Sequence, residues 1–380
     1  MEYVKFSKFI ISTQYGYTAE ETSLVEGDAK YLRITDIVPY FVNKEQVPFC
    51  KIDDNKKKKY LISENDLLIA RTGATTGYNL VVDESYKNFV FASYLIRFNY
   101  NKNELYPLYL KYVLKSQQWY GFVNNFISGS AQPGMNAKVF GKFQIPFFNY
   151  DIQKRISNIL STYDKLIDNN NKRIKLLEQM AENLYKEWFV RFRFPGYEDA
   201  EFENGIPKEW EYTKLERLAN ISTGKCNRED AEEDGAYPLF DRSQEIKRSN
   251  VWLKDCEAII VPGEGTSFIP RYYNGKFNLH QRCYCVEPSE KGMGFFLYQT
   301  LMMYRKYFLY VATGATVPSL RLNNFNNFKA LLPKKELCFQ YNGIAEKMND
   351  EILLLKNKNE LLTKQRDLLL PRLMSGKLEV

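Results

Sequence analysis

The sequence contains a single histidine, His280, in 380 residues, and its six cysteines follow no regular spacing. Mechanisms that rely on a histidine base or on a multi-histidine metal site are therefore nearly excluded. The scattered cysteines indicate reduced thiols rather than a disulfide framework, which favours a cytoplasmic protein. The first residues lack the features of a secretory signal, and the best candidate for a membrane span, 292–304, stops at Arg305 and is too short.

Motifs for nucleotide chemistry are also missing. No Gly-x-x-x-x-Gly-Lys-Ser/Thr loop occurs, and the Pro-Pro-aromatic loop that adenine methylation needs is absent. The Gly-Glu-Gly stretch at 263–265 lacks the third glycine of a nucleotide-binding loop, so we interpret it as a tight turn. His280, Cys283 and Cys285 match no common zinc pattern, and buried cysteines on a strand are the simpler interpretation. The sequence therefore predicts no catalytic residue, metal or cofactor in this chain.

The residues that are present indicate a large folded protein. Apolar residues make up 44% of the chain and aromatic residues 15%, which is enough to build two or more cores at this length. Short β-rich runs such as 66–70 and 89–98 alternate with glycine-rich turns and tyrosine-rich helical stretches, so the predicted fold class is α+β. The net charge of +7 favours polyanionic partners, although only weakly.

Two segments carry a seven-residue hydrophobic repeat, one beginning near Asp151 and one closing the chain, and both predict long coiled-coil helices. The positions that we assign to the seam of these helices are Leu160, Ile167, Asn170, Ile174, Leu177, Leu184, Trp188, Ile352, Leu355, Asn359, Leu362 and Leu369. Asparagine in a seam specifies register at a cost in stability, and Arg366 interrupts the second seam as well. A break of the first helix at 168–171 is the alternative, because Asn and Asp compete with the helix backbone. Pro371 predicts that the second helix kinks or ends at Leu370.

The two halves of the chain repeat each other. A shift of 185 residues superposes Leu160 on Ala345 with the heptad phase kept, and it carries Pro133 to Pro318. We therefore interpret the chain as a duplicated unit, with a globular domain followed by a helix in each copy. Turn residues mark the boundary between the copies. The predicted division is a globular domain at 1–150, a helix with linker at 151–205, a second globular domain at 206–333 and a second helix at 334–380.

Basic residues beside turns and strand ends are the candidates for contacts with DNA. Arginine in such positions can read guanine edges through two hydrogen bonds, and lysine can neutralise phosphate. For each residue alone, an ordinary solvated surface is the alternative. The candidates are Arg33, Lys57, Lys58, Arg71, Arg242, Lys247, Arg248 and Arg271.

Several short motifs occur in order along both copies. The first copy has Gly-Ser-Ala-Gln-Pro-Gly at 129–134 and Phe-Gln-Ile-Pro at 143–146. The second opens on Asn-Gly-Ile-Pro at 204–207 and has Thr-Gly-Ala-Thr-Val-Pro at 313–318. With the two helices, these stretches make the whole chain resemble the specificity subunit of Type I restriction-modification systems. The start of the chain departs from the family pattern, because it lacks the Gly-Ile-Pro-Lys-Glu-Trp type of entry that precedes the second domain.

The resemblance implies that the two globular domains are target recognition domains, each of which reads one half of a split, asymmetric site in double-stranded DNA. It implies that the two helices pack antiparallel, hold the domains apart and dock two methyltransferase subunits, with restriction subunits joining the full complex. S-adenosylmethionine, ATP and magnesium are implied for those partners. Since the base-reading residues of the family vary, none is carried over to this chain.

The expected function is thus DNA recognition by a non-catalytic subunit, for adenine methylation or restriction. The alternatives are a specificity subunit of a differently organised restriction enzyme, a self-contained modification or restriction enzyme, and a coiled-coil adaptor that binds only protein. An adaptor predicts no affinity for DNA, whereas phosphate contacts require an affinity that falls with rising salt.

Overall fold

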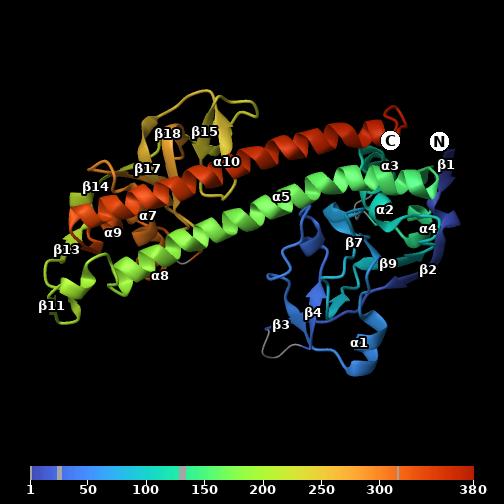
Figure 1. Ribbon diagram of the computed structural model, residues 1–380, viewed down its shortest axis with the longest axis horizontal. Coiled ribbons are helices and arrows are strands. Elements are labelled where there is room, and N and C mark those ends of the chain that lie inside the picture. The colour runs from blue at the N-terminus through green and yellow to red at the C-terminus, as the bar shows by residue number, and fades with distance from the viewer. Residues whose placement is uncertain (1, 24–27, 128–133, 315) are drawn as a thin grey trace. The chain divides into compact units, whose positions relative to one another are not determined.

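The computed structural model describes residues 2–23, 28–127, 134–314 and 316–380, and the chain divides into two compact units. The first unit comprises Met1–Asn171 and Lys356–Val380, and the second comprises Lys172–Leu355. The two longest helices are α5 (Tyr150–Tyr185) and α10 (Lys335–Met374), which Figure 1 draws in green and red. Each unit therefore combines one globular part with a segment of each of these helices.

The globular part of the first unit is built on two four-stranded sheets. One sheet has the order β2-β9-β6-β7 and the other has the order β3-β5-β4-β8, while β1 pairs with β10. The strands are β1 (Glu2–Lys5), β2 (Ile10–Tyr15), β3 (Glu21–Thr22), β4 (Ala29–Leu32), β5 (Phe49–Cys50), β6 (Leu67–Ala70), β7 (Asn79–Val81), β8 (Phe89–Phe91), β9 (Leu95–Tyr100) and β10 (Gln144–Phe147). The helices are α1 (Asp54–Tyr60), α2 (Pro107–Val113), α3 (Gln117–Ile127) and α4 (Ala137–Phe140). Phe98 and Trp119 share the main core with Leu160 of α5 and Leu373 of α10, so the long helices are part of this core.

The second unit is built on one six-stranded sheet of order β14-β19-β17-β18-β15-β16. Its strands are β14 (Ala219–Thr223), β15 (Tyr237–Phe240), β16 (Lys247–Ser249), β17 (Lys254–Pro262), β18 (Arg271–Leu279) and β19 (Cys283–Pro288). Two further strand pairs are β11 (Phe202–Glu203) with β12 (Ile206–Pro207), and β13 (Glu211–Lys214) with β20 (Lys329–Leu332). The helices are α6 (Leu215–Leu218), α7 (Gly294–Met303), α8 (Arg305–Val311) and α9 (Leu322–Asn326). Phe296 and Phe325 share a core with Tyr185 of α5 and Tyr341 of α10, so the long helices belong to this core too.

Both units follow the same plan, which confirms the predicted α+β duplication. In each unit one strand near the start of the globular part, β1 or β13, pairs antiparallel with the strand that precedes a long helix. Val4 lies opposite Ile145 in the first unit, and Thr213 lies opposite Ala330 in the second. The run 89–98, predicted as one strand, is instead divided between β8 and β9, which belong to different sheets.

The long helices decide two points that the sequence left open. α5 runs through 168–171 without interruption, so the alternative of a broken first helix is wrong. α10 continues past Pro371 to Met374, so of the two outcomes predicted at Leu370, a kink or an end, the end is wrong. Leu373 and Met374 are buried in the first core, and this burial offsets the hydrogen bond that proline cannot donate. None of the helices in the described ranges combines the length and apolar character needed to cross a membrane.

Candidate nucleic-acid interface

Two loops meet at the end of β6 in the first unit. Arg71 donates its backbone N–H to Tyr94 O over 3.0 Å and accepts from Met135 N over 2.8 Å. Its guanidinium carbon lies 4.9 Å from the ring centroid of Tyr15, and its Nε donates to Ser93 O over 3.2 Å. Tyr15 and Tyr94 are both about half exposed. This arrangement, which we call the first junction, presents a cation beside exposed aromatic rings.

The second unit forms an equivalent junction at the end of β17. Gly263 donates its backbone N–H to Arg282 O and accepts from Leu320 N, both over 2.8 Å, which repeats the hydrogen bonds of the first junction. A Cβ atom at Gly263 would lie only 2.7 Å from Arg282 O, so a side chain is not accommodated there. Instead the neighbouring Glu264 accepts from Arg242 over 2.6 Å and forms an ion pair with Arg282. The second junction thus carries two arginines on one carboxylate.

Glu264 organises these two arginines. Burial by itself raises the pKa of Glu264, but hydrogen bonds from Arg282 and Arg242 outweigh burial and hold the pKa below its usual value. The carboxylate is therefore ionised at neutral pH. The arginine side chains remain open to solvent, with exposed fractions of 46% for Arg242 and 56% for Arg282. Since a guanidinium has five N–H donors, both side chains keep donors for a ligand.

A cavity of about 310 Å³ opens at the second junction. The charged and titratable residues that line it are Arg228, Asp241, Arg242, Glu264 and His280. Burial lowers the pKa of His280 and the charge of Arg242 lowers it further, so the imidazole is neutral at neutral pH. Burial raises the pKa of Asp241, but hydrogen bonds from Lys247 and Ser243 outweigh it and bring the pKa to about 2. A wall with fixed donors and acceptors suits a polar ligand such as a base edge.

The long helices form a second kind of surface, and their mutual contacts establish that they run antiparallel. In the first unit Asn170 Nδ2 donates to Asn359 Oδ1 over 2.8 Å, while Asp164 further back on α5 pairs with Arg366 further along α10 over 2.9 Å. The predicted seam residues that are buried are Leu160, Ile167, Asn170, Ile174, Trp188, Ile352 and Leu355, and those of intermediate exposure are Leu177, Leu184, Asn359, Leu362 and Leu369. Apolar side chains also face solvent on these helices, namely Leu166, Leu176, Met180, Leu353, Leu354, Leu361 and Leu368.

Comparison with known proteins places the chain in a family. The family model described as Type I restriction modification DNA specificity domain matches it twice, at 24–179 and 207–366. The chain belongs to this family. It is 25% identical over 300 residues to the Type I restriction enzyme MjaIX specificity subunit of Methanocaldococcus jannaschii, a match that covers 72% of this chain and 69% of that protein. It is 33% identical over 144 residues to the Type I restriction enzyme EcoDI specificity subunit of Escherichia coli, which covers 38% of this chain and 31% of that one.

A solved structure of the same kind shares the fold. The S subunit of a Type I restriction-modification system from M. genitalium superposes with a TM-score of 0.61 at 17% identity, covering 98% of this chain and 95% of that one. The resemblance expected from the sequence is therefore confirmed, and the chain is a non-catalytic specificity subunit. Within the part of the chain that the structure describes, no group of three or more His, Cys, Asp or Glu residues is arranged to hold a metal ion.

The predicted DNA-contact residues of the first unit of this specificity subunit have different surroundings. Arg33 is held by two carboxylates, those of Glu21 and Asp36, over 2.7 and 2.8 Å. Lys57 on α1 donates to a backbone carbonyl over 2.9 Å, and Lys58 on the same helix is exposed. Arg71 alone among them belongs to the first junction.

In the second unit three of the four predicted residues gather around the loop that follows β15. Arg242 belongs to the second junction, and Lys247 Nζ lies 2.8 Å from Asp241 Oδ2. Arg271 donates from its two Nη atoms to backbone carbonyls over 2.8 and 2.6 Å, so its donors serve the fold. Arg248 likewise donates to two carbonyls, over 2.8 and 2.9 Å.

Glu264 and Arg282 are the residues that reasoning from the sequence missed. The Gly-Glu-Gly stretch bends after β17, with Gly265 at a φ of 131°, and its glutamate carries the second junction. Glu264 forms a β-bridge with Ser319, directly after the repeated motif at 313–318, and this contact between distant segments leaves no local signal in the sequence. Residues 129–133 of the matching motif in the first copy, and residue 315 in the second, lie outside the described residues.

Proposed function

We propose that this specificity subunit binds double-stranded DNA and reads a bipartite, asymmetric target, with one globular part on each half-site. The observation that carries the proposal is the pair of equivalent junctions. The same backbone hydrogen bonds support Arg71 beside aromatic rings in one unit, and Arg242 with Arg282 on a carboxylate in the other. Different side chains on equivalent backbones offer different hydrogen-bond patterns to base edges, which gives two unlike half-sites.

Three of the remaining basic candidates complete this interface as phosphate contacts. Lys57 and Lys58 on α1, with the exposed Arg248 on β16, supply charge that carries little sequence information but adds affinity. Arg33, Lys247 and Arg271, whose donors are engaged within the fold, hold the loops around them in place. The recognition domains have the limits 1–150 and 206–333 in this proposal.

The long helices α5 and α10 provide the surface on which the partner subunits dock. The solvent-facing leucines on α5 and α10 support docking of two methyltransferase subunits, because apolar rows on a helix surface mark protein contacts. Those subunits bind S-adenosylmethionine and flip the target adenine, while this subunit supplies binding energy and register. Restriction subunits that use ATP and magnesium join the same assembly when DNA is cleaved.

The test compares Arg71→Ala with Arg282→Ala in the complex with its methyltransferase. Once the methylated motif is known, binding is measured on probes in which either half-site is altered, across a range of salt concentrations. Each variant should lose discrimination at one half-site only, by about 1–3 kcal/mol, because one arginine reads one base pair. Arg173→Gln, at an exposed position on α5, is the matched control and should bind like the wild type.

Equal losses at both half-sites in a folded complex would contradict the assignment of one globular part to each half-site. Affinity that does not fall with salt would contradict DNA binding altogether, since phosphate contacts release counterions.

A further inference from the structure

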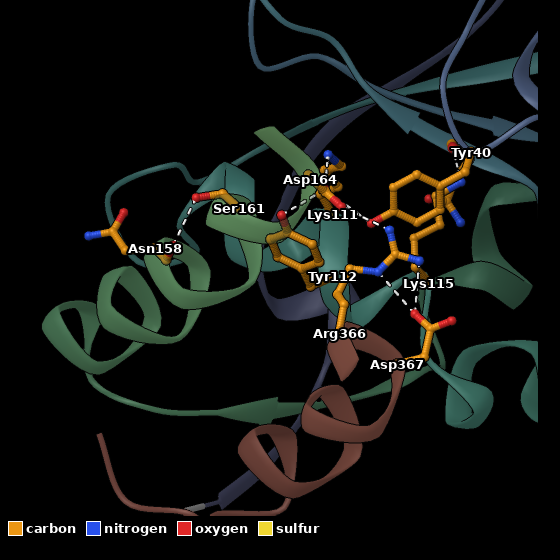
Figure 2. Close-up of polar contacts among 10 residues, drawn as sticks. Tyr40, Lys111, Tyr112, Lys115, Asn158, Ser161, Asp164, Arg366 and Asp367 are labelled. Atoms are coloured by element: carbon orange, nitrogen blue, oxygen red, sulfur yellow. Dashed lines mark hydrogen bonds and ion pairs between the residues drawn. The ribbon is translucent and has the colours of Figure 1, made fainter. Parts of the chain in front are cut away.

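A buried ion pair connects both long helices with the globular part of the first unit. Asp164 of α5 and Arg366 of α10 are 5% and 6% exposed, and Asp164 Oδ1 accepts from Arg366 Nη1 over 2.9 Å. The other carboxylate oxygen accepts from Tyr40, Lys111 and Tyr112 over 3.1, 2.9 and 2.8 Å. These four donors use the lone pairs that an ionised carboxylate offers. We call these five residues the charge cluster, and Figure 2 shows them converging on Asp164.

The arginine of the charge cluster is held as fully as the aspartate. Its Nε and Nη2 donate to Asp367 Oδ1 over 2.9 and 2.8 Å. Its guanidinium carbon lies 3.9 Å from the ring centroid of Tyr40, which belongs to the loop between β4 and β5. The Tyr40 ring thus contacts α10, and its hydroxyl contacts α5. A single loop residue is therefore fixed to both helices at once.

The electrostatics of the charge cluster favour the charged, paired state. Burial raises the pKa of Asp164, but the charge and hydrogen bond of Lys111 and the hydrogen bond of Arg366 outweigh burial and lower it. The pKa of Arg366 is raised, because Tyr40 and the two aspartates outweigh its burial. A displacement that separates the pair leaves a charge unpaired in the interior, which is far more costly than the loss of an exposed pair.

The pair distinguishes one end of the duplicated molecule from the other. The shift of 185 residues that superposes the two copies places Asn349 at the counterpart of Asp164 and Ala181 at the counterpart of Arg366. In the second unit Ala181 instead accepts, through its backbone O, from Tyr341 Oη over 3.0 Å. The first globular part is therefore joined to the helices by charges that the second copy replaces with other residues.

We propose that Asp164 and Arg366 are positioning residues that fix the first globular part on the helices and so set the separation between half-sites that the subunit accepts. This role rests on the proposed function, because spacing matters only for a split target. Apolar contacts tolerate small displacements, whereas a buried pair with filled hydrogen bonds has one geometry. A rigid link between recognition elements fixes half-site spacing, as dimer geometry does in other DNA-binding proteins.

The test uses the full-length chain in complex with its methyltransferase subunits. Substrates carry the two half-sites at the native separation, or at separations one base pair shorter or longer, and methylation is compared among them. Asp164→Asn and Arg366→Met should lower the preference for the native separation by about tenfold, which corresponds to about 1.4 kcal/mol. The bases read within each half-site should not change. Tyr40→Phe, which removes one hydroxyl and keeps the ring, should have a smaller effect in the same direction.

The matched control is Arg173→Gln with Glu351→Gln. This ion pair, 2.7 Å long, joins the same two helices in the second unit, but its side chains are 53% and 36% exposed. Its loss should leave the spacing preference unchanged, because exposed pairs contribute little.

Three results would overturn the proposal. The first is a loss of methylation that is equal at every separation, which would give the charge cluster a purely structural role. The second is an unchanged preference in Tyr40→Phe if the other two variants do not fold. The third is the absence of a split motif in the wild type, which would also overturn the proposed function and is seen before any variant is made.

Discussion

Two arginines near the same loop of the second unit differ in role. The surroundings of each residue show whether its side chain stabilises the fold or is available to contact DNA. Arg271 donates two hydrogen bonds to the backbone carbonyls of Asp241 and Ser243, and burial lowers its pKa. Arg282 is more than half exposed, and its guanidinium is ion-paired with Glu264. The same kind of residue should therefore give opposite results in stability and in binding.

Arg271→Ala should lower the free energy of unfolding of the second unit by about 1–3 kcal/mol, because it removes two hydrogen bonds from a charged donor and the contact of the guanidinium with the Phe240 ring. Arg282→Ala should change stability by less than about 0.5 kcal/mol, as exposed substitutions usually do. Chemical denaturation of both variants beside the wild type measures this difference. Equal destabilisation by the two substitutions would contradict the distinction between them.

The surroundings of Lys115 predict that the stability of the folded chain changes with pH in the alkaline range. Burial, with Lys111 and Arg366 nearby, lowers the pKa of Lys115 from 10.5 to about 8 in the folded chain. Between these values the unfolded chain binds more protons than the folded chain, so the contribution of Lys115 to stability rises with pH. Burial raises the pKa of the neighbouring Tyr40 and Tyr112, which therefore stay protonated in this range.

The variant Lys115→Met removes this titration. Relative to the variant, the wild type should gain stability between about pH 8 and pH 10.5, by no more than about 1.4 kcal/mol per pH unit. Thermal unfolding of both proteins at several pH values in this range provides the measurement. A difference between them that stays constant with pH would show that Lys115 titrates normally.

Arg282 and Glu264 also mark where sequence reasoning ends at this scale. A charged residue in a loop has no periodicity, and its partner lies 18 residues away along the chain. Arg71 was predicted because it directly follows a recognisable strand and stands before Thr72-Gly73, and these local signals placed it beside a turn. No local signal states that Arg242 and Arg282 share one carboxylate.

At the scale of elements, the long helices were predictable and the sheets were only partly so. A seven-residue repeat is a local signal, so the heptads of α5 and α10 could be read directly. The run 89–98 shows the opposite case, because its division between two sheets depends on distant strands, with Phe89 paired to Lys30 and Ile96 to Tyr15. Pro371 stays within a helix because the core covers the residues after it.

The asparagine contact between the helices allows a test at this scale. Asn170 and Asn359 bond to each other at positions where the neighbouring seam residues, Ile174 and Leu355, are apolar, and such a pair fixes register at a cost in stability. The double variant Asn170→Leu with Asn359→Leu should raise the free energy of unfolding by about 1–3 kcal/mol through apolar burial. In this variant α5 and α10 should also pair in more than one register, and light scattering should detect more self-association. A less stable and strictly monodisperse variant would contradict this role.

At the scale of the whole molecule, duplication explains both the similarity and the difference of the two units. The shift of 185 residues and the repeated motifs predicted two copies, and the family model matches each of them. The differences between the copies required the structure. Equivalent junctions carry different side chains, and the charge cluster around Asp164 exists where the second copy has Asn349 and Ala181. A duplicated chain needs such differences between its two copies if it is to recognise an asymmetric DNA site.

The central claim is that each globular part reads one half of a split DNA site. The most direct measurement is to map methylated adenines in cells that carry the methyltransferase with this chain, and again after 206–333 is replaced by the same region of a relative. One half of the motif should change while the other half stays the same, and the chimera should still assemble with its partner. An unchanged motif, or the loss of both halves from an assembled and folded complex, would contradict the account.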